Sequence, residues 1–268
     1  MAHLPRVPKP VHQWTSDDLE SYNIKLEYQD ASRFFELGPN EQLPEPEVRE
    51  PEILTARDAW GTTKDDSYTF LRLLKGANGY TVTEETAVVD FTYFLMHMIG
   101  YTSRLHKRIV RTRKRIQILI AGELKDSVID LCLIDETNNM LLVIQEDKRA
   151  IDKHASDPCA QLIAAAIATV HDRDARRRPL GLAPVTSKVI PAIIMSNSAP
   201  TFYKIPVTAA LTSAISSGEF PQHETIISVH IPQVPRRERR LQEGLDPLEN
   251  RKPTLRCFEA LKKFFNGP

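Results

Sequence analysis

The chain has 268 residues, which suits one large domain with an extension or two small domains. It carries 35 basic and 35 acidic residues, and 41% of its residues are hydrophobic, as expected for a globular chain with a packed core. The first residues lack the apolar segment of a signal peptide, and the longest apolar runs fall short of the ~20 residues that span a membrane. Three cysteines without metal-ligand spacing exclude a disulfide scaffold and a zinc site. We therefore expect an intracellular protein, cytoplasmic or nuclear, with no membrane partner.

The zero net charge conceals a separation of acids and bases. Residues 1–60 hold twelve acids and six bases, whereas residues 104–115 hold seven bases and no acid. Shorter basic runs occur at residues 176–178 and 236–240. Such runs are typical of a phosphate-binding track or a nuclear-import signal, although a solvated surface is the plainer alternative. The candidate nucleic-acid-binding residues are Arg104, Lys107, Arg108, Arg111, Arg113, Lys114 and Arg115.

Residues 1–60 are predicted to be a peripheral extension, and residues 61–268 the main domain. Seven of the 19 prolines fall at or before Pro51, and residues 43–47 are too rich in proline and glutamate for a core element. Between these prolines, residues 17–37 carry enough apolar side chains for one or two short helices that dock on the domain.

From residue 65 the hydrophobic pattern predicts alternating helices and strands. Runs that are apolar throughout belong in the middle of a sheet that helices cover on both faces. The pattern therefore predicts an α/β sandwich with a mixed sheet. We expect helices over residues 65–74, 84–100, 158–171, 208–217 and 255–265, and strands over residues 116–121, 127–134, 140–144, 188–195 and 225–231.

Two charged features interrupt the buried strands. Asp130 stands alone between Ile129 and Leu131, and Glu146-Asp147-Lys148 follows the apolar run of the next strand. A carboxylate among apolar neighbours costs several kcal/mol unless a cation is near it. Strand alternation puts Glu146 and Lys148 on one face, and a tight hairpin would bring Asp130 to the same height.

Two carboxylates beside an amine form a recognisable chemical set. Paired carboxylates attract a hard divalent cation such as Mg²⁺ or Mn²⁺, which polarises a phosphoryl group and lowers the pKa of a bound water. A neighbouring lysine can orient that water or stabilise developing charge. This set is the minimum equipment for metal-assisted hydrolysis of a phosphodiester.

The order Asp130, then Glu146-x-Lys148 on the next strand, then a helix with Gln161, resembles the PD-(D/E)XK phosphodiesterase superfamily. That group includes restriction endonucleases, junction resolvases and uncharacterised members, fungal ones among them. The resemblance covers about residues 80–200. It implies a restriction-endonuclease-like α/β/α sandwich around a four-stranded mixed core, acting on DNA or RNA.

The resemblance also implies a role for each matching residue. Asp130, Glu146 and the main-chain carbonyl of Asp147 would be metal ligands, and Lys148 would orient the water or phosphate. A glutamate of the first helix, Glu85 in preference to Glu84, would complete the site together with Gln161. Ile129 stands where the superfamily's proline sits, and Ala165 replaces the tyrosine that follows its glutamine.

Each candidate residue also has a plainer interpretation. Asp130 could pair with an arginine for structural reasons, and Glu146 and Lys148 could form a solvated strand end. Gln161 could satisfy a backbone group, and Glu85 could interact with a helix dipole. His97 and Cys132 are better explained as structural residues than as a metal ligand and a nucleophile. The sequence contains no phosphate-binding glycine loop, nucleophile elbow or HExxH motif.

The sequence leaves three functional hypotheses. The first is a Mg²⁺- or Mn²⁺-dependent nuclease, and the second is a catalytically silent module of the same fold that binds nucleic acid or a protein. The third is an interaction protein whose proline-rich arm and terminal helix drive oligomerisation, so a homodimer stays open. Retention of both carboxylates and of the lysine favours the nuclease.

Overall fold

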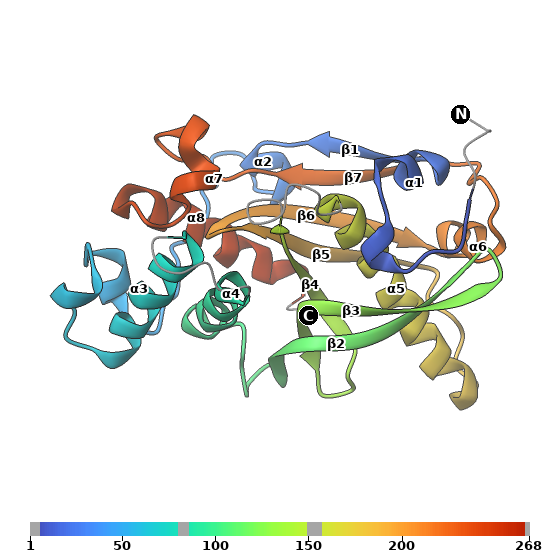
Figure 1. The fold of residues 1–268 in the computed structure, drawn as a ribbon, viewed down its shortest axis with the longest axis horizontal. Helices are drawn as coiled ribbons and strands as arrows, with labels where there is room; N and C mark the ends of the chain where they lie inside the picture. Colours follow the sequence, from blue (N-terminus) through green and yellow to red (C-terminus); the bar gives the residue numbers. More distant parts are fainter. Residues whose placement is uncertain (1–5, 80–85, 149–156, 266–268) are drawn as a thin grey trace.

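A computed structural model describes residues 6–79, 86–148 and 157–265. They form one seven-stranded mixed sheet with helices on both faces (Figure 1). The strands follow the order β1-β7-β6-β5-β4-β3-β2 across the sheet. The α/β class and the mixed central sheet are therefore confirmed, although the sheet is larger than the four strands that the resemblance implies.

The strands are β1 (Ile24–Tyr28), β2 (Arg108–Ile120), β3 (Glu123–Asp135), β4 (Met140–Glu146), β5 (Ser187–Ser196), β6 (Ala199–Thr208) and β7 (Thr225–His230). The helices are α1 (Ser16–Ser21), α2 (Ala31–Phe34), α3 (Asp65–Ala77), α4 (Ala87–Met98), α5 (Pro158–Arg177), α6 (Ala209–Ser217), α7 (Arg240–Glu243) and α8 (Leu248–Leu261). Short 3-10 helices include η1 (Val11–Gln13) and η2 (Pro51–Leu54). No helix among the described residues is long and apolar enough to cross a bilayer.

The central strands separate two hydrophobic cores because their side chains alternate between faces. In β4, Val143 joins the core beneath α5, whereas Leu142 and Ile144 join the core shared with α3, α4 and α8. The helix α5 connects β4 to the parallel strand β5, as a crossover helix must. Asp157 caps this helix by accepting a hydrogen bond from the Cys159 amide, which confirms the predicted start.

The edge strand β2 differs from its prediction. We expected a strand only from residue 116, with the bases before it in a connection, but β2 begins at Arg108. Five of the seven candidate bases therefore lie within the strand. An edge strand tolerates such charges because its outer side faces solvent, and charged side chains there discourage pairing with other chains.

Two further strands were not predicted. The strand β6 contains Pro200 and Pro206, which argue against a central strand. Its pairing with β7 covers only Phe202 to Lys204, so neither proline interrupts that ladder. The strand β1 belongs to the first 60 residues and pairs in parallel with β7, so this segment supplies an edge of the sheet in addition to its short helices.

The buried side chain of Arg251 ties α8 to η2 and to the segment that follows it. Its guanidinium donates hydrogen bonds to the carbonyls of Ile53 and Ala56 at 2.9 and 2.6 Å, and to those of Leu245 and Asp246 at 3.0 Å each. Burial lowers the pKa of Arg251. The hydrogen bonds to main-chain oxygens compensate for the loss of water around this cation.

We predict that Arg251→Met destabilises the fold by about 3 kcal/mol or more, because it leaves several buried carbonyls without a donor. Urea unfolding followed by circular dichroism would measure the loss. The matched control is Lys252→Met on the same helix, since Lys252 is exposed and pairs with Glu45 at 2.8 Å. That control should change stability by less than about 1 kcal/mol. Equal losses in both variants would contradict the structural role of Arg251.

Candidate functional site

The hairpin of β2 and β3 is kinked at Asp130. The register pairs the residues on either side but passes over Arg113 and Asp130, and Arg113 has a φ of 50°. Ile129 packs in the core beneath α5, whereas Leu131 packs in the opposite core. Regular alternation would place both on one face, so β3 is irregular at Asp130; the register is the same on both sides, so no residue is inserted as in a β-bulge. The kink leaves this acid half-buried instead of fully enclosed.

The neighbouring strand β4 supplies hydrogen bonds to the Asp130 carboxylate. Its Oδ2 accepts from Gln145 Nε2 at 2.7 Å and from the Glu146 amide at 3.1 Å. Burial raises the pKa of Asp130, and the Glu146 amide, Lys148 and Arg113 oppose that rise without cancelling it. The sequence prediction that this acid needs a nearby cation agrees with the positions of these two bases.

The end of β4 is fixed by β5. Glu146 pairs with Met195, and the Asp147 amide donates to the Met195 carbonyl at 2.9 Å. The Asp147 carboxylate accepts from Ser196 Oγ at 2.8 Å. Glu146 and Asp147 are only 4% and 8% exposed, whereas Lys148 is exposed. The strand end is thus a rigid, mostly buried support for one exposed amine, which is not the solvated strand end of the plainer interpretation.

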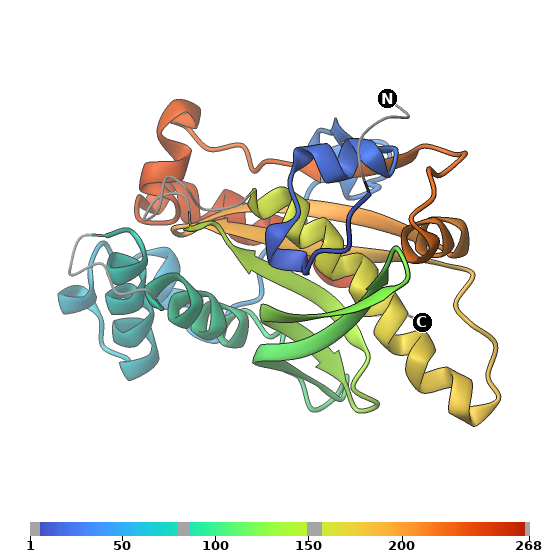
Figure 2. The ribbon, with the colours of Figure 1, turned by 45° about the vertical axis from the view of Figure 1, so that its right-hand side comes forward.

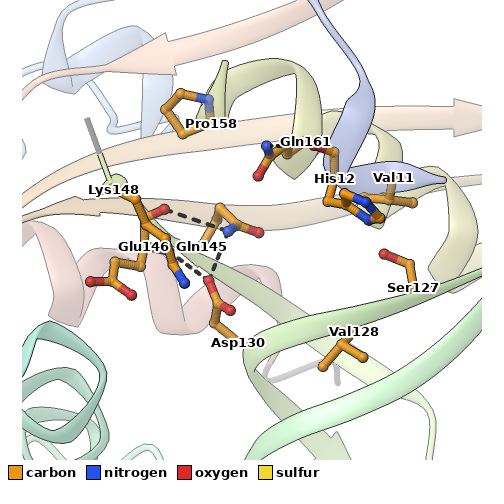
Figure 3. Close-up of a pocket in the computed structure, with 10 residues that line it drawn as sticks. All are labelled: Val11, His12, Ser127, Val128, Asp130, Gln145, Glu146, Lys148, Pro158 and Gln161. Atoms are coloured by element: carbon orange, nitrogen blue, oxygen red, sulfur yellow. Dashed lines mark hydrogen bonds between the residues drawn. The ribbon is translucent and has the colours of Figure 1, made fainter. Parts of the chain in front are cut away.

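Four of the predicted site residues line a single pocket (Figure 3). They come from β3, β4, the turn after β4 and the first turn of α5, and are Asp130, Glu146, Lys148 and Gln161. The other lining residues are Val11, His12, Ser127, Val128, Gln145 and Pro158. Glu85 and Glu84 lie outside the described residues.

The two acids of this pocket do not point the same way. Leu131 faces Ile144, so the next pair along the hairpin sets Asp130 beside Gln145 and sends the Glu146 side chain toward the other face. In Figure 3 the Lys148 amine lies beside the Asp130 carboxylate, while the Glu146 carboxylate points away from both. The sequence predicts that two carboxylates and an amine lie close together. The structure brings together the Asp130 carboxylate and the Lys148 amine, but not the Glu146 carboxylate.

Asp130 and Glu146 both line the pocket and carry carboxylate oxygens, the ligand type that a hard cation prefers, but the Glu146 carboxylate points away from Asp130. The described residues contain no group of three or more His, Cys, Asp or Glu side chains that could hold a metal ion. An ion shared by these two acids would need the Glu146 side chain to turn toward Asp130, with water completing its shell.

Gln161 has a defined partner in the N-terminal segment. Its Nε2 donates to the main-chain carbonyl of His12 at 2.9 Å. The plainer interpretation, in which this glutamine satisfies a backbone group, therefore describes one of its contacts, while its position also lines the pocket.

The predicted nucleic-acid-binding residues divide into two groups. Arg108 is buried, donates to the Tyr101 carbonyl at 2.9 Å and lies over the Phe265 ring, so its side chain contacts the protein interior and is not on the exposed face of the run. Lys107 is exposed but pairs with Glu136 at 3.1 Å. The others are exposed, or half-buried for Lys114, and comprise Arg104, Arg111, Arg113, Lys114 and Arg115.

The two shorter basic runs make many contacts within the protein. Arg176 pairs with Asp172 at 3.2 Å, and Arg236 pairs with Glu243 and Glu249 at 3.0 and 3.1 Å. Arg240 is buried and donates to the Pro200 carbonyl. These contacts are those of structural residues, so only the run on β2 keeps its interpretation as a binding track.

Two other expected structural residues also have local partners. The His97 ring stacks on Tyr93, with ring centroids 6.2 Å apart. Cys132 is fully buried, and burial raises the pKa of its thiol to about 11, which keeps it protonated. Cys132 therefore occupies a core position, whereas His97 is half-buried on α4 beside the exposed Tyr93.

Sequence reasoning missed Gln145 and His12. Gln145 could have been found by extending the hairpin register one pair beyond the apolar run. His12 gives no such signal, because it lies more than a hundred residues before β3 and β4, in a segment that is predicted to be peripheral.

The chain matches no protein-family model, and comparison with curated proteins finds no relative.

We predict that Asp130→Asn stabilises the fold at about pH 7 by about 0.5–2 kcal/mol. The raised pKa means that the folded state favours the proton, so wild-type stability falls as pH rises above the ordinary carboxyl range. Asparagine removes this loss and can still accept both hydrogen bonds. Urea unfolding across the pH range should show a gain that disappears toward about pH 3.

Asp135 on the same strand is the control, because its pKa shift, and therefore the expected change in stability, has the opposite direction. Burial raises its pKa, but hydrogen bonds from Thr137 and Asn139 outweigh burial and lower it. Asp135→Asn should therefore destabilise the protein at neutral pH, and the difference should vanish in acid as the wild-type group protonates. If Asp130→Asn is the less stable protein at about pH 7, burial is not what governs Asp130.

Proposed function

We propose that this protein is a divalent-metal-dependent nuclease of the PD-(D/E)XK type, hydrolysing phosphodiester bonds of DNA or RNA. The observation that supports it best is the shared pocket of Asp130, Glu146 and Lys148, with the Lys148 amine beside the Asp130 carboxylate. The succession α4, β2, β3, β4, α5 and β5 supports it too, since β2 to β5 lie next to one another.

In this proposal Asp130, Glu146 and the main-chain carbonyl of Asp147 hold Mg²⁺ or Mn²⁺. When bound, such an ion polarises a phosphoryl oxygen and lowers the pKa of a coordinated water. The Asp130 carboxylate is suited to a cation because burial disfavours its charged form and leaves that charge incompletely compensated.

In this proposal Lys148 orients the attacking water. It is exposed, so it can reach substrate, and it follows directly on a strand end that β5 fixes. A point charge on a long stem can contact a phosphate oxygen or the water as charge develops.

The outer edge of the sheet provides a path for a phosphate backbone in this proposal. Arg111, Arg113 and Arg115 are exposed on β2, and the charge of Arg113 acts on Asp130 across the kink. This run of bases passes across from Asp130 at Arg113 and would hold the polymer along that edge of the sheet.

The second candidate is a catalytically silent module of this fold that binds nucleic acid or a protein partner. It is favoured by the direction of the Glu146 carboxylate, which points away from Asp130 in Figure 3. In such a module the basic strand β2 would keep its role and the two acids would need no ion.

We predict that the purified protein cleaves DNA or RNA with Mg²⁺ or Mn²⁺ and stops in EDTA. Lys148→Ala should lower the rate by about 10²-fold or more, because it removes the group that orients the water. Initial rates on plasmid, single-stranded DNA and RNA would measure this. Lys252→Ala, which removes an exposed lysine on α8, is the control and should keep the rate.

Two results would oppose this proposal. One is nucleic-acid binding of equal strength with and without EDTA, and no cleavage with either ion, which describes the silent module. The other is full activity in Lys148→Ala with an unchanged melting temperature, which would leave a nuclease but reject the PD-(D/E)XK site proposed for it.

We predict that Arg113→Gln and Arg115→Gln each weaken oligonucleotide binding and lower the slope of log affinity against log salt by about 1. The effect should not depend on base sequence, because phosphate contacts carry no sequence information. Fluorescence anisotropy at several salt concentrations would measure it. Lys25→Gln on β1, the opposite edge strand, is the matched control. A slope that changes as much for Lys25→Gln would exclude a track on β2.

A further inference from the structure

The N-terminal segment forms one wall of the candidate site. In η1, Val11 is only 3% exposed and belongs to the core beneath α5, and Trp14 just after it is 1% exposed. The Trp14 ring stacks on Tyr22, with ring centroids 5.5 Å apart. Figure 2 shows this segment (blue) beside the first half of α5, and η1 contacts both α5 and β3. Residues on either side of His12 are therefore anchored in the protein.

The backbone of His12 is also held from α5. Gln161 Nε2 donates to the His12 carbonyl at 2.9 Å, and Gln161 lies in the first turn of a helix whose start is capped by Asp157. The His12 side chain itself is exposed, and its closest described hydrogen-bonding neighbour is the Gln13 amide at 3.5 Å. A fixed backbone with an exposed ring is the arrangement of a residue that can contact a ligand.

The ring occupies the side of the pocket opposite Lys148. Figure 3 shows the imidazole near Ser127 and Gln161, with Gln145 and Asp130 between it and the lysine. The charged groups that line the same pocket are Asp130 and Glu146 from the sheet and Lys148 after it. The pocket thus has a nitrogen donor at each side and acceptor oxygens between them.

We infer that His12 contacts a phosphate group of a nucleic-acid strand bound in this pocket, on the side away from Lys148. An imidazole N–H donates to a phosphate oxygen in either protonation state of the ring. Gln161 is then a positioning residue. Its side-chain amide binds the main-chain carbonyl of His12 and thereby fixes the position of the imidazole ring. The identity of the ligand in this inference rests on the proposed function, whereas the position of His12 in the pocket does not.

The test is the affinity of short fluorescent single- and double-stranded oligonucleotides, measured in EDTA so that no cleavage occurs. His12→Ala should weaken binding by about tenfold, the value of one hydrogen bond to a charged group. His12→Gln keeps a donor and should recover most of that loss. His223→Ala, an exposed histidine in the turn before β7, should leave the affinity unchanged.

A double variant separates positioning from direct contact. If Gln161 acts through His12, Gln161→Ala should weaken binding in the wild-type background and have little effect in the His12→Ala background. Additive losses would mean that Gln161 contacts the ligand itself. An unchanged melting temperature of His12→Ala would show that its effect is not one of folding, as expected for an exposed side chain.

The outcomes distinguish this inference from the proposed nuclease. Cleavage with normal affinity and KM in His12→Ala would overturn the inference and leave the nuclease standing. Binding that depends on His12, without cleavage under any metal condition, would support the inference and reject the nuclease. Wild-type protein that binds neither form of oligonucleotide would overturn it as well.

Discussion

The candidate site depends on how the sheet accommodates one carboxylate. Asp130 lies between two hydrophobic cores, where an ionised group without partners costs several kcal/mol. The kink at Arg113 exposes it partly, and Gln145 and the Glu146 amide donate to one of its oxygens. Both donors belong to β4, so the contacts that satisfy the acid also fix the register of the hairpin. A slip by one residue would move Asp130 into a core, and this penalty specifies the pairing.

The remaining parts of the site are assembled on that hairpin from distant segments. The parallel pairing with β5 fixes the end of β4 through Met195 and Ser196. It thereby also fixes the position of the Lys148 backbone, which follows directly. The start of α5 brings Gln161 to the same place, and Gln161 holds the N-terminal segment by the carbonyl of His12. Packing and main-chain hydrogen bonds hold these elements in place and so fix the positions of the polar groups that line the pocket.

The sequence predicts those helices and strands whose form follows from the residues of the segment itself. An unbroken apolar run gives β4, and Asp157 followed by proline gives the start of α5. Three features follow from tertiary contacts instead. The basic stretch of β2 is a strand because it pairs with β3, and β6 tolerates prolines because they lie outside its ladder with β7. The direction of Glu146 depends on the exact pairing of Asp130, since a shift of one residue exchanges the faces of a strand.

The charge of Asp130 bears on the choice between the two proposed functions. The two donors from β4 require an acceptor, and the oxygen of an asparagine could accept both, although a hydrogen bond to a carboxylate is the stronger one. Burial, meanwhile, opposes the anion and raises the pKa of Asp130. The hydrogen bond from the Glu146 amide favours the anion, as do the positive charges of Lys148 and Arg113, but together they compensate its burial only in part. A module that merely binds phosphate would be better served by a neutral residue here, because an anion repels phosphate. A site that recruits a divalent cation needs that charge, and on this physical ground the nuclease is the stronger of the two.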